Sequence, residues 1–137
     1  MRKILLIDDE PTLLRLLSMN LTARGYDVET GPDASAATVH EIDRIRPDLL
    51  VLDLGLPDKD GMQVLRELRT TRPGLPIVIL SARIERYVKV AALDLGAADY
   101  ITKPFGMDEL LARLRSVMRR VNGAAAVPIA RVGDLNG

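Results

Sequence analysis

Short apolar runs and segments with helical spacing alternate five times along the chain. The apolar runs span residues 4–7, 26–30, 49–52, 77–80 and 99–102. The first, third and fourth runs are continuously apolar, as strands covered on both faces must be. The second and fifth alternate polar and apolar residues, which is typical of half-exposed edge strands. The pattern therefore predicts a sheet of five parallel strands, with the second and the fifth at its edges.

The segments between these runs carry apolar residues at helical spacing. These residues are Leu14, Leu17 and Leu21; Val39 and Ile42; Val64, Leu65 and Leu68; Val88, Ala92 and Leu95; and Leu110, Leu114, Val117 and Val121. Pro11 suits the first turn of the first helix, and Gly25 and Gly96 suit the ends of the first and fourth. We expect the fifth helix to stop at Asn122 and Gly123. The alternation predicts an α/β fold: a doubly wound, flavodoxin-like parallel sheet of order 2-1-3-4-5 with five helices.

The chain has 137 residues, which is the length of one domain with a short tail. After residue 122 the composition shifts to Gly-Ala-Ala-Ala-Val-Pro, which is typical of a linker or a frayed end. No stretch reaches the ~18–20 uninterrupted apolar residues of a membrane span. The first apolar run also ends at Asp8, too early for a signal peptide. We expect one domain over 1–121, located in the cytoplasm with no membrane contact.

Composition narrows the chemistry that this domain can perform. Nineteen basic and nineteen acidic residues give a formal net charge of zero, which argues against a domain that mainly grips nucleic acid. The absence of cysteine excludes disulfides, thiol nucleophiles and Cys-ligated zinc. The single histidine, His40, excludes a multi-His metal site and argues against a Ser/His/Asp triad. What remains is chemistry by carboxylates, hydroxyls, lysine and the backbone.

Such groups stand where the predicted strands end. Asp8 and Asp9 follow the first run, Asp53 the third, Ser81 the fourth and Lys103 the fifth. Ligands of open parallel sheets bind beyond the carboxyl ends of the strands, so we expect these five side chains to converge there. Each alone could be a helix cap, a turn residue or a solvated charge. Their shared edge and complementary chemistry favour a site.

Three neighbouring carboxylates repel one another unless a cation lies among them. Ligands that are oxygen only favour a hard ion, Mg²⁺ or Mn²⁺. With such an ion bound, Asp53 can attack phosphorus in line, Lys103 can neutralise the phosphoryl oxygens, and Ser81 can donate a hydrogen bond. The residues therefore suggest phosphoryl transfer onto Asp53, with an acyl phosphate as product.

Four motifs resemble the signature set of the receiver domain of bacterial two-component response regulators. They are Ile-Asp-Asp-Glu at 7–10, Val-Leu-Asp-Leu-Gly-Leu-Pro-Asp-Lys-Asp-Gly at 51–61, Leu-Ser-Ala at 80–82 and Ile-Thr-Lys-Pro-Phe at 101–105. The resemblance covers about residues 2–121 and implies the CheY-like form of the fold. It implies that Asp53 accepts the phosphoryl group from a sensor histidine kinase. It also implies that Asp9, Asp53 and the Gly55 carbonyl bind the metal, with Asp8 acting mainly through water.

The same resemblance implies a switch rather than a turnover enzyme, with only autophosphorylation and autodephosphorylation of its own. Lys103 would pair with the phosphoryl group, and its bond to Pro104 would be cis. The Ser81 hydroxyl would move toward the phosphoryl oxygens while Tyr100 turns inward. Tyr100 has an ordinary alternative as an amphipathic edge-strand residue. Residues at the positions of Gly55 and Arg83 would control how water reaches the acyl phosphate.

Residues 89–100 and 109–120 resemble the fourth-helix, fifth-strand and fifth-helix face of OmpR/PhoB-type regulators. That resemblance implies a symmetric homodimer, with Lys89 pairing with Glu109 and Asp99 with Arg113 across the two-fold axis. The alternative is a solvated charged face. The chain departs from the pattern at Ala98, where relatives carry an acid, and exposed ion pairs contribute only ~0–1 kcal/mol each. We therefore expect a weakened dimer.

The tail at 130–137 is similar to the first strand of the winged-helix domain that follows the linker in that subfamily. The resemblance implies that 122–137 hold a linker and the start of a truncated DNA-binding effector domain. DNA would then be bound only through the missing part, and phosphorylation would control transcription by switching dimerisation. The alternative is a stand-alone receiver that acts through protein–protein contacts.

Overall fold

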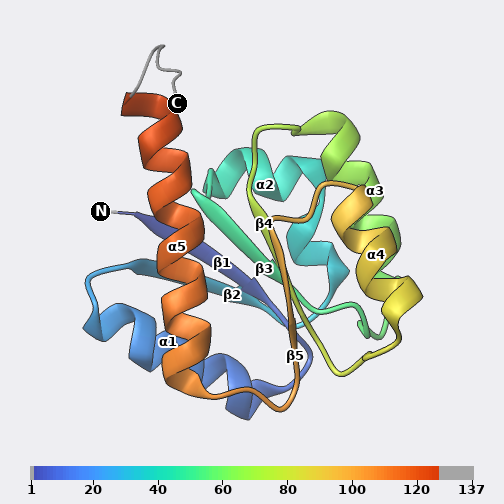
Figure 1. Ribbon diagram of the computed structural model, residues 1–137, viewed down its shortest axis with the longest axis horizontal. Coiled ribbons are helices and arrows are strands. Elements are labelled where there is room, and N and C mark those ends of the chain that lie inside the picture. The colour runs from blue at the N-terminus through green and yellow to red at the C-terminus, as the bar shows by residue number, and fades with distance from the viewer. Residues whose placement is uncertain (1, 127–137) are drawn as a thin grey trace.

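A computed structural model describes residues 2–126 of the chain, and the side chains of residues 2–120. Its five parallel strands are joined by helices in strict alternation (Figure 1). The elements are β1 (Lys3–Ile7), α1 (Pro11–Ala23), β2 (Asp27–Gly31), the 3₁₀ turn η1 (Ala34–Ala37), α2 (Val39–Ile45), β3 (Leu49–Leu52), α3 (Gly61–Thr71), β4 (Ile77–Ser81), α4 (Arg86–Asp94), β5 (Asp99–Thr102) and α5 (Met107–Ala126). The strand order is β2-β1-β3-β4-β5, which confirms the predicted fold.

Two apolar cores lie on opposite faces of the sheet. In β1, Ile4 and Leu6 pack toward α1 and α5, whereas Leu5 and Ile7 pack toward α2, α3 and α4. Figure 1 shows the same division, with α1 and α5 on one face of the sheet and α2, α3 and α4 on the other. Successive strand residues point to opposite faces, so a strand covered on both must be apolar throughout. This is why β1, β3 and β4 have continuously apolar runs.

The two edge strands are only partly covered. The Asp27 side chain of β2 is exposed, and Lys3 on neighbouring β1 lies 3.6 Å from both the Asp27 and the Glu29 carboxylates. In β5, Tyr100 and Ile101 are buried, while Asp99 is partly exposed. The alternating polar residues that predicted edge positions therefore face solvent, and the prediction is confirmed.

Glycines stand just after α1 and α4, where the sequence predicts the helix ends, but α5 does not end at its predicted residue. Gly25 after α1 and Gly96 after α4 have φ angles of +91° and +106°, a left-handed region that favours glycine. The expected stop of α5 at Asn122 and Gly123 is wrong, because the helix continues to Ala126. A glycine inside a helix lowers helix stability by about 1 kcal/mol, which does not prevent the helix from continuing. The three residues after Gly123 are alanines, which favour helix.

Helix α5 extends past the predicted end of the domain. The predicted boundary at residue 121 falls inside this helix. The segment 130–137, which resembles the start of an effector domain, lies outside the described residues. Within the described residues, every helix is too short or too polar to cross a bilayer.

Candidate functional site

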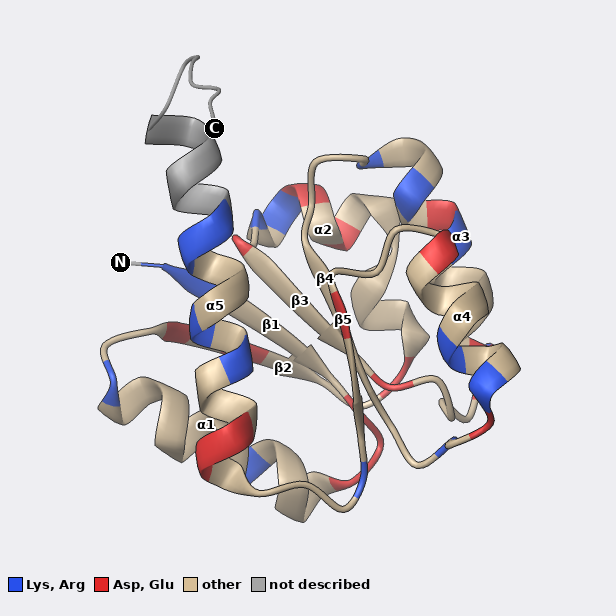
Figure 2. Ribbon diagram, in the orientation of Figure 1, with Lys and Arg blue, Asp and Glu red and all other residues tan. Residues whose placement is uncertain are grey.

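The candidate site lies at the carboxyl edge of the sheet, where the predicted residues converge. Asp8 and Asp9 follow β1, Asp53 follows β3, Ser81 is the last residue of β4, and Lys103 follows β5. Because β1 pairs directly with β3, the loops that carry the three acids are neighbours. Figure 2 shows acidic segments in the loops that leave this edge. The parallel sheet thus brings together groups that are up to 95 residues apart in the chain.

Three carboxylates form a compact cluster at this edge. One oxygen each from Asp8, Asp9 and Asp53 lies within 4.8 Å of the others. Asp8 and Asp53 are buried, whereas Asp9 is exposed. Burial raises the pKa of Asp53, and a hydrogen bond from the Gly55 N–H and the charge of Lys103 oppose that rise. An all-oxygen cluster that is open on one side fits a hard divalent cation that keeps some of its waters.

Lys103 is surrounded by carboxylates. Its Nζ lies 2.8 Å from Asp8 Oδ2, 3.5 Å from Glu10 Oε1 and 3.6 Å from Asp53 Oδ2. Burial lowers the pKa of Lys103, but the bond to Asp8 and the neighbouring acidic charges outweigh it, so the pKa is raised. Its bond to Pro104 is cis, as the family resemblance implies. One ammonium group therefore lies near several carboxylates, and the site has an excess of negative charge.

The loop after β3 holds the Asp53 carboxylate by its backbone. Asp53 Oδ1 accepts a hydrogen bond from the Gly55 N–H at 3.1 Å, which leaves Oδ2 on the side of Lys103. Gly61, the first residue of α3, lies against this loop: a Cβ there would stand 2.5 Å from the Asp53 carbonyl oxygen and 2.5 Å from Leu54 Cα. Glycine at position 61 thus allows α3 to begin directly beneath the loop.

Ser81 and Tyr100 both contact the backbone of Arg83. The Ser81 hydroxyl accepts a hydrogen bond from the Arg83 N–H at 3.1 Å, and the Tyr100 hydroxyl donates one to the Arg83 carbonyl at 2.8 Å. Both side chains are buried, and burial raises the pKa of Tyr100. Tyr100 is therefore a core residue rather than an amphipathic edge residue. Ser81 does not cap α4 either, because the N-cap position belongs to Glu85.

Three of the four charged residues expected at a dimer face, Lys89, Glu109 and Arg113, line a cavity of about 140 Å³ over β5. Arg113 Nη1 lies 3.1 Å from Asp99 Oδ2, and Arg113 Nη2 lies 3.0 Å from Glu109 Oε2. Lys89 forms no ion pair with another described residue, and its Nζ stands 5.9 Å from the centre of the Tyr100 ring. In the single chain, both acids are thus paired with the same arginine.

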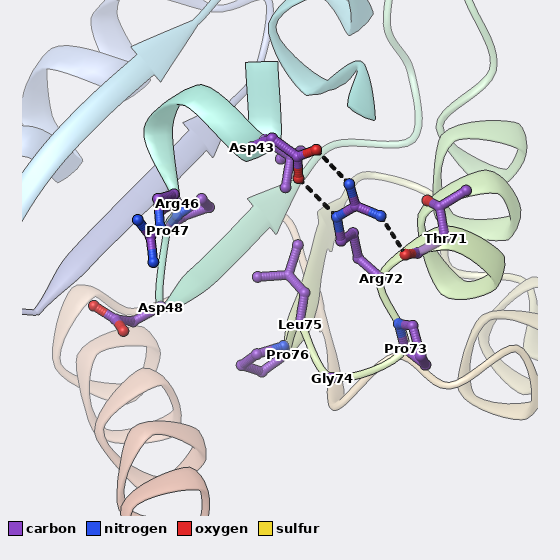
Figure 3. A pocket seen from close by; sticks show the side chains of 11 residues that line it. Asp43, Arg46, Pro47, Asp48, Thr71, Arg72, Pro73, Gly74, Leu75 and Pro76 are labelled. Carbon is purple, nitrogen blue, oxygen red and sulfur yellow. Dashed lines mark hydrogen bonds and ion pairs between the residues drawn. The ribbon is translucent and has the colours of Figure 1, made fainter. Parts of the chain in front are cut away.

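A larger cavity, of about 670 Å³, opens at the opposite edge of the sheet. It lies between the α2–β3 and α3–β4 turns, and Figure 3 shows Arg72 reaching across to Asp43. Arg72 Nε donates to Asp43 Oδ1 at 2.7 Å, a second guanidinium N–H donates to the other oxygen, and these bonds lower the pKa of Asp43. This pair is matched one to one, unlike the group of acids around Lys103.

Sequence reasoning placed the three acids, the hydroxyl and the lysine together, and the structure confirms that they meet. It missed Glu10, which lies beside Lys103 although its side chain is exposed. The available signal was its position directly after Asp8 and Asp9 in the same loop. His40 is exposed on α2 and takes no part in the site.

Comparison with known proteins shows which family the chain resembles. The profile of the response regulator receiver domain matches residues 4–115. The transcriptional regulatory protein KdpE of Mycobacterium tuberculosis is 51% identical over 125 residues, which cover 91% of this chain and 54% of that protein. The alkaline phosphatase synthesis transcriptional regulatory protein PhoP of Bacillus subtilis is 44% identical over 124 residues, with coverages of 90% and 51%. The chain thus spans about half the length of these relatives.

A similar structure has also been solved. The BeF3-activated N-terminal receiver domain of RstA from Klebsiella pneumoniae superposes with a TM-score of 0.80 and 37% sequence identity. The superposition covers 86% of this chain and 99% of that domain. The whole of that receiver domain therefore has a counterpart here.

Proposed function

The chain belongs to the response regulator receiver domain family, and from that premise we propose that it accepts a phosphoryl group on Asp53 from a sensor histidine kinase. The observation that carries this proposal is the buried Asp53 carboxylate, with a lysine ammonium 3.6 Å from its free oxygen and two further acids beside it. Few purely structural arrangements gather three carboxylates in a partly buried place, because ionised acids repel one another there.

The acids Asp8, Asp9 and Asp53, with the carbonyl of Gly55, would hold Mg²⁺ or Mn²⁺. Bound there, the ion supplies positive charge next to the phosphoryl oxygens. The set fits this role because it offers only oxygen ligands and because Asp9 opens it to solvent. Asp8 has a second function in the chain, since its Oδ2 binds the Lys103 ammonium.

The transfer itself is a displacement at phosphorus. Asp53 Oδ1 is occupied by the Gly55 N–H, so Oδ2 is the oxygen free to attack. A bond forms between Oδ2 and phosphorus as the bond from phosphorus to the donor's imidazole nitrogen breaks, and the imidazole leaves with that electron pair. Lys103 already stands on the side of Oδ2 and would bind the phosphoryl oxygens as they arrive.

The switch would start from the same edge. A phosphoryl oxygen on Asp53 offers the Ser81 hydroxyl a charged acceptor. Ser81 at present binds the Arg83 backbone, which Tyr100 also holds. Tyr100 already lies inward in this structure, so phosphorylation would stabilise that position rather than create it. It would do so by biasing an equilibrium between two arrangements of this loop and of Tyr100 through contacts that exist in only one of them. Gly55 and Arg83 would flank the acyl phosphate and set how fast water removes it.

We propose that residues 1–121 form the receiver and that 122–137 lead into a DNA-binding effector domain in a longer, cytoplasmic transcription regulator. The relatives it matches are named as transcriptional regulatory proteins, and the chain spans half their length. Phosphorylation would favour a homodimer through α4, β5 and α5, with Lys89 pairing with Glu109, and Asp99 with Arg113, between copies. The second candidate, a stand-alone receiver that signals by protein contacts, uses the same site. In either case the chain is a switch that phosphorylates and dephosphorylates itself, not a turnover enzyme.

The test is phosphorylation by acetyl phosphate with Mg²⁺, followed by intact mass and a base treatment. The mass should rise by one phosphoryl group that base removes, and chelation of the metal should prevent the rise. Asp53→Asn should abolish labelling. Asp43→Asn, at the opposite edge, is the matched control and should label like the unmodified chain. Unchanged labelling of Asp53→Asn, or no labelling of the unmodified chain, would contradict the proposal.

A further inference from the structure

Glu10 is the acidic neighbour of Lys103 that has no assigned role, although it ends the motif at 7–10. It occupies the N-cap position of α1, but its side chain makes no capping hydrogen bond. Its backbone N–H donates instead to Asp8 Oδ1 at 2.9 Å, and its carboxylate lies 3.5 Å from Lys103 Nζ. Asp8 thus binds both residues, one with each oxygen. The loop directs Glu10 toward the lysine rather than toward its own helix.

Exposure separates Glu10 from the other partners of Lys103. The side chains of Asp8 and Asp53 are 5% and 8% exposed, whereas that of Glu10 is 59% exposed. An incoming phosphoryl donor therefore meets two exposed acids before it reaches Asp53, namely Asp9 and Glu10, and of these Glu10 is the one paired with Lys103. It can also leave Lys103 without crossing the buried part of the site.

Resting on the proposed function, we propose that Glu10 is a positioning and selectivity residue for phosphorylation of Asp53. Its carboxylate holds the Lys103 ammonium at the solvent side of the unphosphorylated site and repels donors in proportion to their negative charge. When the phosphoryl group arrives, its oxygens replace Glu10 on Lys103, and Glu10 turns into solvent. Selectivity follows because the repulsion between partly solvated charges scales with the charge of the donor and weakens with added salt.

Two small donors separate this effect from a structural one. Acetyl phosphate is a dianion at neutral pH, whereas phosphoramidate carries a net charge of about minus one. Glu10→Gln keeps the size and the oxygen of the side chain and removes only its charge. We expect Glu10→Gln to raise the second-order labelling rate with acetyl phosphate by about three- to tenfold. Because the repulsion is proportional to the charge of the donor, the labelling rate with phosphoramidate should rise by about the square root of that factor. Both increases should shrink in about 0.5 M salt.

Glu67→Gln is the matched control, because Glu67 is also an exposed glutamate paired with a lysine, at 2.6 Å from Lys59, but on α3. It should change neither rate. Glu10→Asp keeps the charge and should retain the lower acetyl phosphate rate. Equal factors for both donors at every salt concentration, or no change in Glu10→Gln, would overturn the role of Glu10 while labelling of the unmodified chain still stands. No labelling of the unmodified chain by either donor would instead contradict the proposed function.

Discussion

Two charged groups at opposite edges of the sheet differ in their balance of charge: the Asp43–Arg72 pair and the cluster of acids around Lys103. At the amino edge, Asp43 and Arg72 meet one to one on the surface beside the larger cavity. At the carboxyl edge, Lys103 lies within 4.0 Å of three carboxylates and is only 14% exposed. A matched surface pair is a common structural contact that contributes little. A partly buried excess of one sign costs stability and is typical of functional sites.

The pKa values of two aspartates express the same difference. Hydrogen bonds from Arg72 lower the pKa of Asp43, whereas burial raises that of Asp53. The first carboxylate is stabilised as an anion by the fold, and the second is destabilised as an anion. Cavity volume would have selected the wrong edge, because the cavity of about 670 Å³ lies at the amino edge, away from the three clustered carboxylates. The comparison teaches that unbalanced charge, and not open space, marks the candidate site.

The largest expected contrast is between the two cations. Lys103→Met should lower the rate of labelling by acetyl phosphate by about 100-fold, because a charged contact to the transferring group is lost. Arg72→Met should leave that rate within about twofold, because Arg72 contacts only the amino edge. Intact mass against time measures both. Equal rates in the two variants would break the distinction between the edges.

A second contrast uses one glycine near each edge, Gly61 at the start of α3 and Gly74 in the α3–β4 turn. Gly61→Ala places a Cβ 2.5 Å from backbone atoms and should lower the free energy of unfolding by about 1–3 kcal/mol. Gly74→Ala meets nothing within 4 Å and should change it by less than about 1 kcal/mol, in the stabilising direction. Urea unfolding measures both. Equal losses would show that the loop after β3 is no more tightly packed than the α3–β4 turn.

The smallest contrast concerns pH. The raised pKa of Asp53 means that the unfolded chain loses this proton first as pH rises above the ordinary value of 3.8, so the ionised group destabilises the fold. Asp53→Asn should therefore raise the free energy of unfolding at pH 7, by on the order of 1 kcal/mol, because the amide carries no charge to bury. The gain should disappear as pH falls below that ordinary value.

The pKa of Asp43 is shifted in the opposite direction to that of Asp53. Its lowered pKa contributes stability above the ordinary value of 3.8, and that contribution is lost as pH falls through the lowered pKa. Asp43→Asn should therefore lower the free energy of unfolding at pH 7 and have no effect at low pH. Urea unfolding of both variants between about pH 3 and 7 measures the two trends. A change of stability in the same direction for both variants at pH 7 would contradict the assigned pKa shifts.

Much of the fold and most of the site could be predicted from local patterns. Continuous and alternating apolar runs identify inner and edge strands because burial on two faces or on one demands different residues. The residue after each run could then be assigned to the carboxyl edge. The end of α5 could not be predicted in this way. The free-energy cost of Gly123 inside a helix is small enough for the helix-forming residues beside it to outweigh it. The turn η1 was not predicted at all.

The sequence by itself determined the strand order, the edge at which the acids gather, and the identity of the groups available there. Only the tertiary structure decided which of them touch. Glu10 reaches Lys103, Tyr100 is buried against the Arg83 backbone, and Arg113 takes both Asp99 and Glu109. The physical reason is that periodicity reports which face of an element is buried. Contacts between side chains on different loops depend instead on how those loops fold over the sheet.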